Sequence, residues 1–223
     1  MKSRYAAVIR MLVAALPLAL GGCAVVSFMV ASFVPEPKTP AAYELEPNQC
    51  VLIFPDDMAQ PLSYPPLKRM LADGLNARLS ELDLVDRTVE YEKLRELTRR
   101  TPTDRPAGGD QILGVAEVAE TLGADTAVYL DIREYRLKDN LSDPVWKGHL
   151  KVLVKVVAAD GERLWPTDQL AGHEVVVTTP LHTSESRHHN VKLTGILADL
   201  MVDKVARLFH AHRGEPERAG ILD

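Results

Sequence analysis

The chain is poor in cysteine, in local catalytic motifs and in clustered basic residues, and each shortage excludes a class of protein. It has 223 residues but two cysteines, Cys23 and Cys50, so a framework of several disulfides is excluded. No Gly-x-Ser-x-Gly elbow is present, and Gly108-Gly109 lacks the following lysine of a phosphate-binding loop. The net charge is −5 without a concentrated Lys/Arg patch, which argues against nucleic acid as a partner.

The N-terminal residues have the layout of a secretory signal peptide. Basic residues Lys2, Arg4 and Arg10 precede a short apolar run over residues 11–20. The next small residues lead into a cysteine, as Leu20-Gly21-Gly22-Cys23. This box, placed behind a basic and an apolar region, resembles the lipobox of bacterial lipoproteins.

The lipoprotein resemblance implies cleavage between Gly22 and Cys23 and acylation of the Cys23 thiol, which would attach the mature chain to a membrane. Residues 1–22 would then be the signal peptide. They carry three basic residues and no acidic one, so the net charge of −5 would become −8 in the mature chain. Ala24, where an aspartate would imply retention in the inner membrane, favours the periplasmic face of the outer membrane.

A membrane-spanning helix is the alternative anchor. No charged residue occurs over residues 11–34, which is long enough to cross a bilayer. Pro17 and the Gly21-Gly22 pair weaken such a helix near its middle. Both anchors leave the remaining chain exported and membrane-bound.

The mature chain is expected to have three parts. Residues 23–49 form a lipidated tether, since four prolines within residues 35–47 favour an extended spacer. Residues 50–212 form a single α/β domain, and residues 213–223 form a flexible tail. Cys50, at the start of an apolar run, is expected to be a small buried hydrophobic residue.

Hydrophobic periodicity predicts an α+β fold. It is a mixed sheet with an antiparallel C-terminal meander and helices packed mainly on one side. The final helix is predicted to bury a stripe that includes Leu200. The expected strands are 50–54, 84–85, 126–136, 146–158 and 172–178, and the expected helices begin near 65, 89, 110 and 191.

Three segments, together with this element order, resemble a bacterial envelope family. The family includes the curli-export lipoprotein, the lipoprotein activators of penicillin-binding proteins, and the N-terminal domain of TolB. The segments are a helix end and strand over 122–130, an Asp-Gly hairpin over 156–165, and a closing helix end over 205–209. The resemblance implies no catalytic motif and no cofactor.

The strand over 146–158 offers the first candidate surface. Its polar side alternates Lys147, His149, Lys151 and Lys155, so a basic strip is expected to face solvent. This strip either discourages edge pairing or binds an acidic partner. Trp146, Lys147, Lys151 and Lys155 are the candidate partner-binding residues.

Catalytic and metal-binding alternatives rest on scattered residues. Asp56 and Asp57 follow a buried strand, and histidines and serines occur between His182 and His189. An envelope hydrolase or metal-dependent enzyme would require these groups to converge. Because no spacing within the histidine segment favours convergence, we expect no catalytic residue and no metal site.

The sequence thus favours a non-enzymatic envelope lipoprotein. Its partner is expected to be another envelope protein, such as a peptidoglycan synthase or an export component, or peptidoglycan itself. Two alternatives stay open, namely the hydrolase or metal-dependent enzyme and a ring-forming assembly or secretion component. The oligomeric state is not predicted.

Overall fold

The computed structural model describes residues 38–58, 61–100, 111–138, 145–180 and 189–213. Across these ranges, residues 40–212 form one compact unit. A second unit is represented only by Lys38, Thr39 and Arg213. Strand β1 (Lys38–Thr39) pairs with β8 (His212–Arg213) in a short two-stranded sheet.

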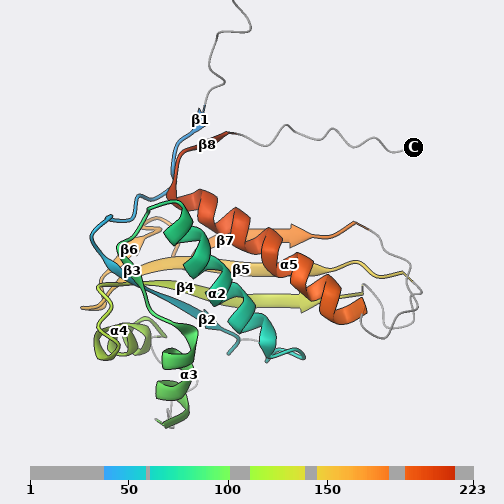
Figure 1. The fold of residues 1–223 in the computed structure, drawn as a ribbon, viewed down its shortest axis with the longest axis horizontal. Coiled ribbons are helices and arrows are strands. Elements are labelled where there is room, and N and C mark those ends of the chain that lie inside the picture. Colours follow the sequence, from blue (N-terminus) through green and yellow to red (C-terminus); the bar gives the residue numbers. More distant parts are fainter. Residues whose placement is uncertain (1–37, 59–60, 101–110, 139–144, 181–188, 214–223) are drawn as a thin grey trace, which may run out of the picture. The chain divides into compact units, whose positions relative to one another are not determined.

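A mixed sheet forms the centre of the compact unit (Figure 1). Its strands are β2 (Cys50–Asp56), β3 (Arg87–Thr88), β4 (Thr126–Arg136), β5 (His149–Ala158), β6 (Arg163–Trp165) and β7 (His173–Thr178). Strand β2 is parallel to β3 and to β4, whereas β5 is antiparallel to β4. Strands β6 and β7 both pair antiparallel with the far edge of β5. The predicted mixed sheet with an antiparallel C-terminal part is confirmed.

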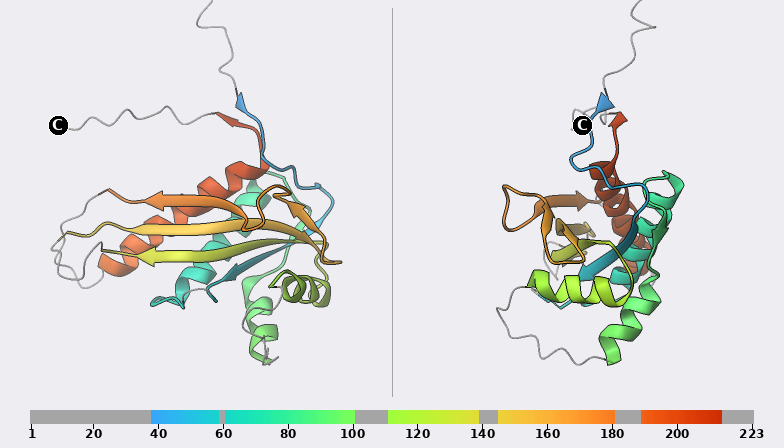
Figure 2. Two further views of the ribbon diagram at one scale, coloured as in Figure 1. Left: turned by 180° about the vertical axis from the view of Figure 1, so that it is seen from behind. Right: turned by 90° about the vertical axis from the view of Figure 1, so that its left-hand side faces the viewer.

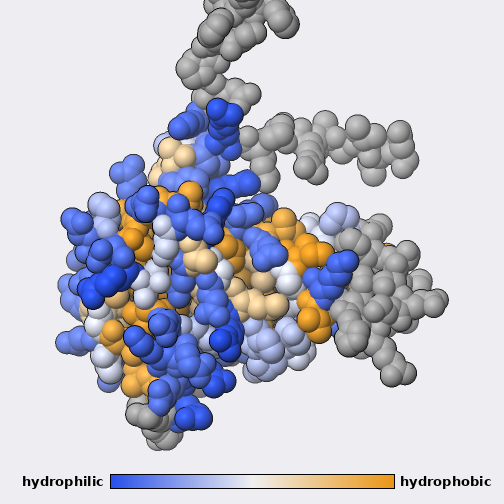
Figure 3. Space-filling model, in the orientation of Figure 1, coloured by the Kyte–Doolittle hydropathy of each residue, from blue (hydrophilic) through white to orange (hydrophobic). Residues whose placement is uncertain are grey.

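Helices cover this sheet unevenly (Figures 1 and 2). The described helices are α2 (Pro66–Glu81), α3 (Tyr91–Arg100), α4 (Gln111–Thr121), α5 (His189–Ala206) and the 3₁₀ turn η1 (Arg207–Phe209). The two longest, α2 and α5, pack against each other and share one core with the inner faces of β4, β5 and β7. The shorter α3 and α4 belong to a second core on the opposite face of β2 and β4. The solvent-exposed side of α2 and α5 is largely hydrophilic and carries separate apolar patches (Figure 3).

The second core explains why the helices are not confined to one side. Every residue of β2 is buried, so this strand needs a layer on each face. Val51 and Ile53 face the α2–α5 core, whereas Leu52 and Phe54 face the α3–α4 core. The expectation of helices mainly on one side therefore holds for the two long helices.

Two predicted turns are present. Gly123 follows α4 with a φ of 69°, a left-handed conformation that ends the helix at low steric cost. Gly161 has a φ of 94° in the turn between β5 and β6, and its N–H donates to the Ala158 carbonyl at 3.0 Å. The Asp160-Gly161 hairpin is therefore confirmed.

Other local expectations are corrected by tertiary packing. The strand beside β2 is β3, formed by Arg87 and Thr88, and not the predicted 84–85. Leu200 is 38 % exposed and is not part of the buried stripe of α5. Residues 40–49, assigned by sequence to the tether, contact the domain, where Leu45 is buried and the Ala42 N–H donates to the Leu208 carbonyl at 2.8 Å.

The described helices are too short or too polar to be membrane spans. The run over 11–34, the predicted signal peptide 1–22 and the predicted lipidation site Cys23 all lie outside the described residues.

Candidate functional site

The predicted basic strip does not form a basic surface. Lys155 is only 6 % exposed, and its ammonium lies 5.6 Å from the centre of the Tyr129 ring. Lys151 is half-buried and forms an ion pair with Glu174 of β7, with 2.6 Å between Nζ and Oε2. The prediction that both lysines face solvent is therefore wrong for Lys155.

Acidic residues from the neighbouring strands compensate the other positions. His149 Nε2 lies 3.3 Å from Glu134 Oε2 on β4. Within β4 itself, Arg133 donates to Asp131. The side of β5 turned away from α2 and α5 consequently carries charges of both signs. Sequence periodicity did not predict this compensation, because His149 and Glu134, like Lys151 and Glu174, meet only once their strands pair.

The remaining predicted contact residues lie beyond the N-terminal end of β5. Trp146 is half-buried, and Lys138 Nζ lies 4.3 Å from the centre of its ring. The Lys147 N–H donates to the Leu137 carbonyl at 3.0 Å. Trp146 and Lys147 thus contact Leu137 and Lys138, which follow β4 in the chain. They lie before the start of β5, apart from the buried Lys155.

The candidate catalytic carboxylates have structural partners. Tyr129 donates its hydroxyl to Asp56 Oδ2 at 2.8 Å, and the Met58 N–H donates to Oδ1 at 3.2 Å. Lys68 Nζ donates to Asp57 Oδ1 at 2.6 Å, and the Leu62 N–H donates to Oδ2 at 3.0 Å. These bonds hold the chain where it leaves β2.

Their electrostatics follows from burial and pairing. Burial alone would raise the pKa of Asp57, but the hydrogen bonds from Lys68 and the Leu62 N–H outweigh burial and lower it. Burial, reinforced by the Asp56 carboxylate, raises the pKa of the Tyr129 hydroxyl, which therefore stays protonated and serves as a donor. Burial also raises the pKa of Asp131, against the opposing effect of Arg133.

The histidine segment that the sequence singled out lies outside the part of the chain whose side chains the structure describes. His182 and His188, with Ser184 and Ser186, lie outside the described residues, as does the side chain of His189. Among the residues that the structure describes, no group of three or more His, Cys, Asp or Glu side chains could hold a metal ion.

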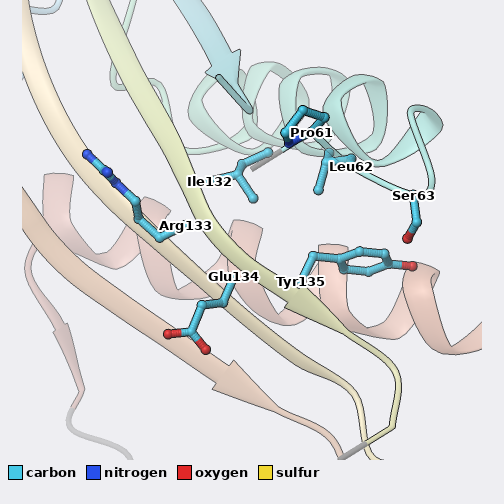
Figure 4. Close-up of a pocket in the computed structure, with 7 residues that line it drawn as sticks. All are labelled: Pro61, Leu62, Ser63, Ile132, Arg133, Glu134 and Tyr135. Carbon is cyan, nitrogen blue, oxygen red and sulfur yellow. The ribbon is translucent and has the colours of Figure 1, made fainter. Parts of the chain in front are cut away.

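Two small hollows flank the carboxylates. One lies between the end of β2 and α3, and it is lined by Phe54, Pro55, Asp56, Lys68, Tyr91, Leu94, Arg95 and Thr98. The other lies between residues 61–63 and the end of β4 (Figure 4). In Figure 4 the Tyr135 ring lies on the side of Leu62 and Ser63, whereas Glu134 points away from them. The Tyr135 hydroxyl is already within 2.6 Å of Thr194 Oγ1.

Cys50 is buried, as predicted, with 7 % of its surface exposed. Its backbone N–H donates to Asp125 Oδ2 at 2.8 Å. Burial raises the pKa of the thiol, so the reactive thiolate is disfavoured.

The outer edge of β7 is a feature that the sequence did not single out. Strand β7 pairs with β5 along one edge, and among the described strands none pairs with the other edge. The Thr179 N–H donates to the Gly148 carbonyl, and this sets the alternation along β7. The backbone groups of Glu174, Val176 and Thr178 consequently point away from β5.

A lysine from α5 occupies the middle of this edge. Lys204 Nζ donates to the Val176 carbonyl at 3.1 Å. This bond agrees with the outward direction of the Val176 backbone groups. It could not be predicted from the sequence, because 28 residues separate donor and acceptor.

Comparisons with known proteins find matches only among solved structures. No protein-family model matches the chain. No curated protein matches it either.

Solved structures of bacterial proteins resemble it at low identity. A PelC dodecamer from Paraburkholderia phytofirmans is 12 % identical, with 80 % of this chain and 99 % of that chain covered and a TM-score of 0.42. Lipoprotein GNA1162 from Neisseria meningitidis is 17 % identical, with 70 % and 97 % covered and a TM-score of 0.42. A minor lipoprotein from Acinetobacter baumannii is 11 % identical, with 71 % and 89 % covered and a TM-score of 0.37. At these values the likenesses establish neither a family nor a function for this chain.

Proposed function

We propose that this chain is a non-enzymatic, lipid-anchored protein of the cell envelope whose α+β unit binds another envelope component. The outer edge of β7 is the observation that carries the binding function. Strand edges with outward N–H and C=O groups pair readily with another chain unless they are protected. Here the described residues place a single side-chain donor, Lys204, on that edge.

The anchor in this proposal is the acylated Cys23 after cleavage at Gly22. Its support is the lipobox-like segment 20–23 behind a basic and apolar leader. Several acyl chains would hold the protein stably at a membrane surface, whereas one chain binds only marginally. We place the protein at the periplasmic face of the outer membrane because Ala24 follows the cysteine.

The absence of an enzymatic role is also a proposal. Its support is that Asp56 and Asp57 each accept two hydrogen bonds that shape the chain after β2. A general base needs a lone pair directed at a substrate. Mutating either carboxylate is therefore expected to affect stability and not a reaction rate.

The anchor is tested by the intact mass of the membrane-extracted protein, compared with that of Cys23→Ala. The proposal predicts a mass of residues 23–223 plus acyl chains, and loss of this form in the variant. A full-length mass from Met1 that Cys23→Ala leaves unchanged, apart from the substitution itself, would mean a helical anchor.

Binding is tested by photo-crosslinking in membranes of the producing cell. A photoreactive residue replaces Lys147, Lys151, Glu174 or Leu200, one position at a time. The proposal predicts an adduct with a defined envelope protein or with peptidoglycan from at least one position. Absence of adducts from all four positions would contradict the binding function.

A further inference from the structure

One side of α5 faces the outer edge of β7. Lys204 reaches the Val176 carbonyl, so its side of the helix faces this edge. Leu200 and Ile196 lie four and eight residues earlier, on the same side of the helix. Leu200 is 38 % exposed, and Ile196 is half-buried. In the left view of Figure 2, β7 is the uppermost strand of the central sheet and α5 crosses behind it.

Among the described residues, the outer edge of β7 has backbone groups that pair with no strand, and the side of α5 next to it has partly exposed apolar side chains, so one added strand could contact both. A strand added beside β7 would pair with the outward groups of Glu174, Val176 and Thr178. Its side chains on the helix side would contact Leu200 and Ile196. The added strand would thus cover apolar surface that the described residues leave exposed.

We propose that this edge binds an extended segment of another envelope protein, which carries a carboxylate and apolar side chains at alternate positions, on the same face of the segment. This inference rests on the proposed function, since it assigns the surface and the partner chemistry through which that function is performed. The carboxylate would accept from Lys204. The Val176 carbonyl, released by Lys204, would then accept from the added strand.

The position of Lys204 argues against a second copy of this chain as the occupant. An antiparallel pair of β7 strands, related by a two-fold axis, would be centred on Val176, the middle of the three outward residues. Two Lys204 ammonium groups would then meet at that axis. Like charges in close contact oppose pairing, whereas a carboxylate from a different partner is attracted.

The test uses a probe of defined chemistry and the full-length, detergent-extracted protein. The probe is a capped pentapeptide of valine, threonine, glutamate, threonine and valine, in which the glutamate and both valines share one face of the strand. Backbone amide shifts are followed by NMR, because short edge-pairing peptides bind weakly. We expect saturable shifts at Glu174, Val176 and Thr178 and much smaller shifts at Val175 and Val177, whose N–H groups pair with β5.

Val176→Pro is the decisive variant. Proline removes the N–H that points outward and leaves the ladder with β5 intact, which makes it tolerable on an edge strand. We expect the shifts at Glu174 and Thr178 to disappear in this variant. Val176→Thr, which retains the N–H, is the matched control and should bind as the wild type does. Unchanged binding by Val176→Pro, with a preserved amide spectrum, would overturn the proposal.

Lys204→Ala tests the partner chemistry. It should weaken binding of the glutamate peptide by about fivefold, to the level of the same peptide with glutamine. Lys93→Ala, an exposed lysine of α3 in the other helical layer, is the control and should not change binding. Equal affinities for the two peptides in the wild type would overturn the assignment of an acidic partner.

Two outcomes separate this inference from the proposed function. If Val176→Pro leaves every crosslinked envelope adduct unchanged, the edge is not the docking site, while the binding function stands. If the wild type instead dimerises and Val176→Pro abolishes the dimer, a second copy occupies the edge and the acidic partner is wrong.

Discussion

The two halves of the central sheet are covered differently. Strand β2 and the first residues of β4 lie between two helical layers, so their side chains are buried on both faces. Strands β5 and β7 share the α2–α5 core on one face, and their other face carries paired charges such as Lys151 and Glu174. The comparison teaches that the doubly covered half supplies stability, whereas the open half supplies surface available to a partner.

Leucine truncation should show the largest difference between the halves. Leu52→Ala in the doubly covered half removes a fully buried side chain and should lower the free energy of unfolding by about 2–5 kcal/mol. Leu153→Ala, the same change on the other face of β5, should cost less, about 2 kcal/mol at the lower end of this range, because the side chain is 8 % exposed and solvent can reach part of the vacated space. Urea unfolding of both variants measures the difference. Equal costs would contradict the distinction between the halves.

The helical layer that both halves share can be tested with two glycines. A Cβ at Gly74 of α2 would lie 2.8 Å from Val202 Cγ2 of α5. Gly74→Ala should therefore destabilise by about 1–2 kcal/mol, since overpacking exceeds the gain in helix propensity. Thermal unfolding followed by circular dichroism shows whether the variant is less or more stable than the wild type.

Gly195→Ala is the matched control for this helix pair. Its added Cβ would have one neighbour, Met70 Cε at 4.0 Å. The variant should be more stable by about 0.5–1 kcal/mol. Destabilisation of both variants to the same degree would mean that the close α2–α5 approach at Gly74 is not specific.

A smaller effect is expected where the doubly covered half ends, at Asp57. The folded-state pKa of Asp57 is lowered, so its contribution to stability is present above the unfolded-state value of 3.8. This contribution is lost as the pH falls from there through the folded-state pKa. Asp57→Asn should therefore show a shallower loss of stability with falling pH below about 4.

Chemical denaturation over a series of pH values measures this slope. Asp73→Asn, an exposed carboxylate of α2 with an ion pair to Arg69, is the control. If stability falls with pH as steeply in Asp57→Asn as in the wild type, protonation of Asp57 does not cause the loss of stability, and this prediction is wrong.

Sequence reasoning predicted the elements whose cause is local. The continuous apolar run of β2, the alternation of β5, the turn at Gly161 and the helix end at Gly123 each depend on residues next to one another in the chain. The mixed sheet followed from their order. Local periodicity also predicted α5, apart from the exposure of Leu200.

The features that define the candidate site depend on contacts between distant segments. Lys155 is buried against Tyr129 of another strand, and Lys204 reaches Val176 across 28 residues. A strand pattern shows which side a residue is on, but not which neighbour compensates its charge. For this reason the candidate binding surface predicted from the sequence is the row of lysines on β5, whereas the one found in the structure is the outer edge of β7.

The most direct test of the edge assignment is the amide spectrum of the full-length protein with the glutamate-containing pentapeptide, for the wild type and for Val176→Pro. The account predicts saturable shifts at Glu174, Val176 and Thr178 in the wild type, and none at Glu174 and Thr178 in the folded variant. Shifts that persist in the variant, or that occur away from β7 in the wild type, would contradict the edge of β7 as the docking site.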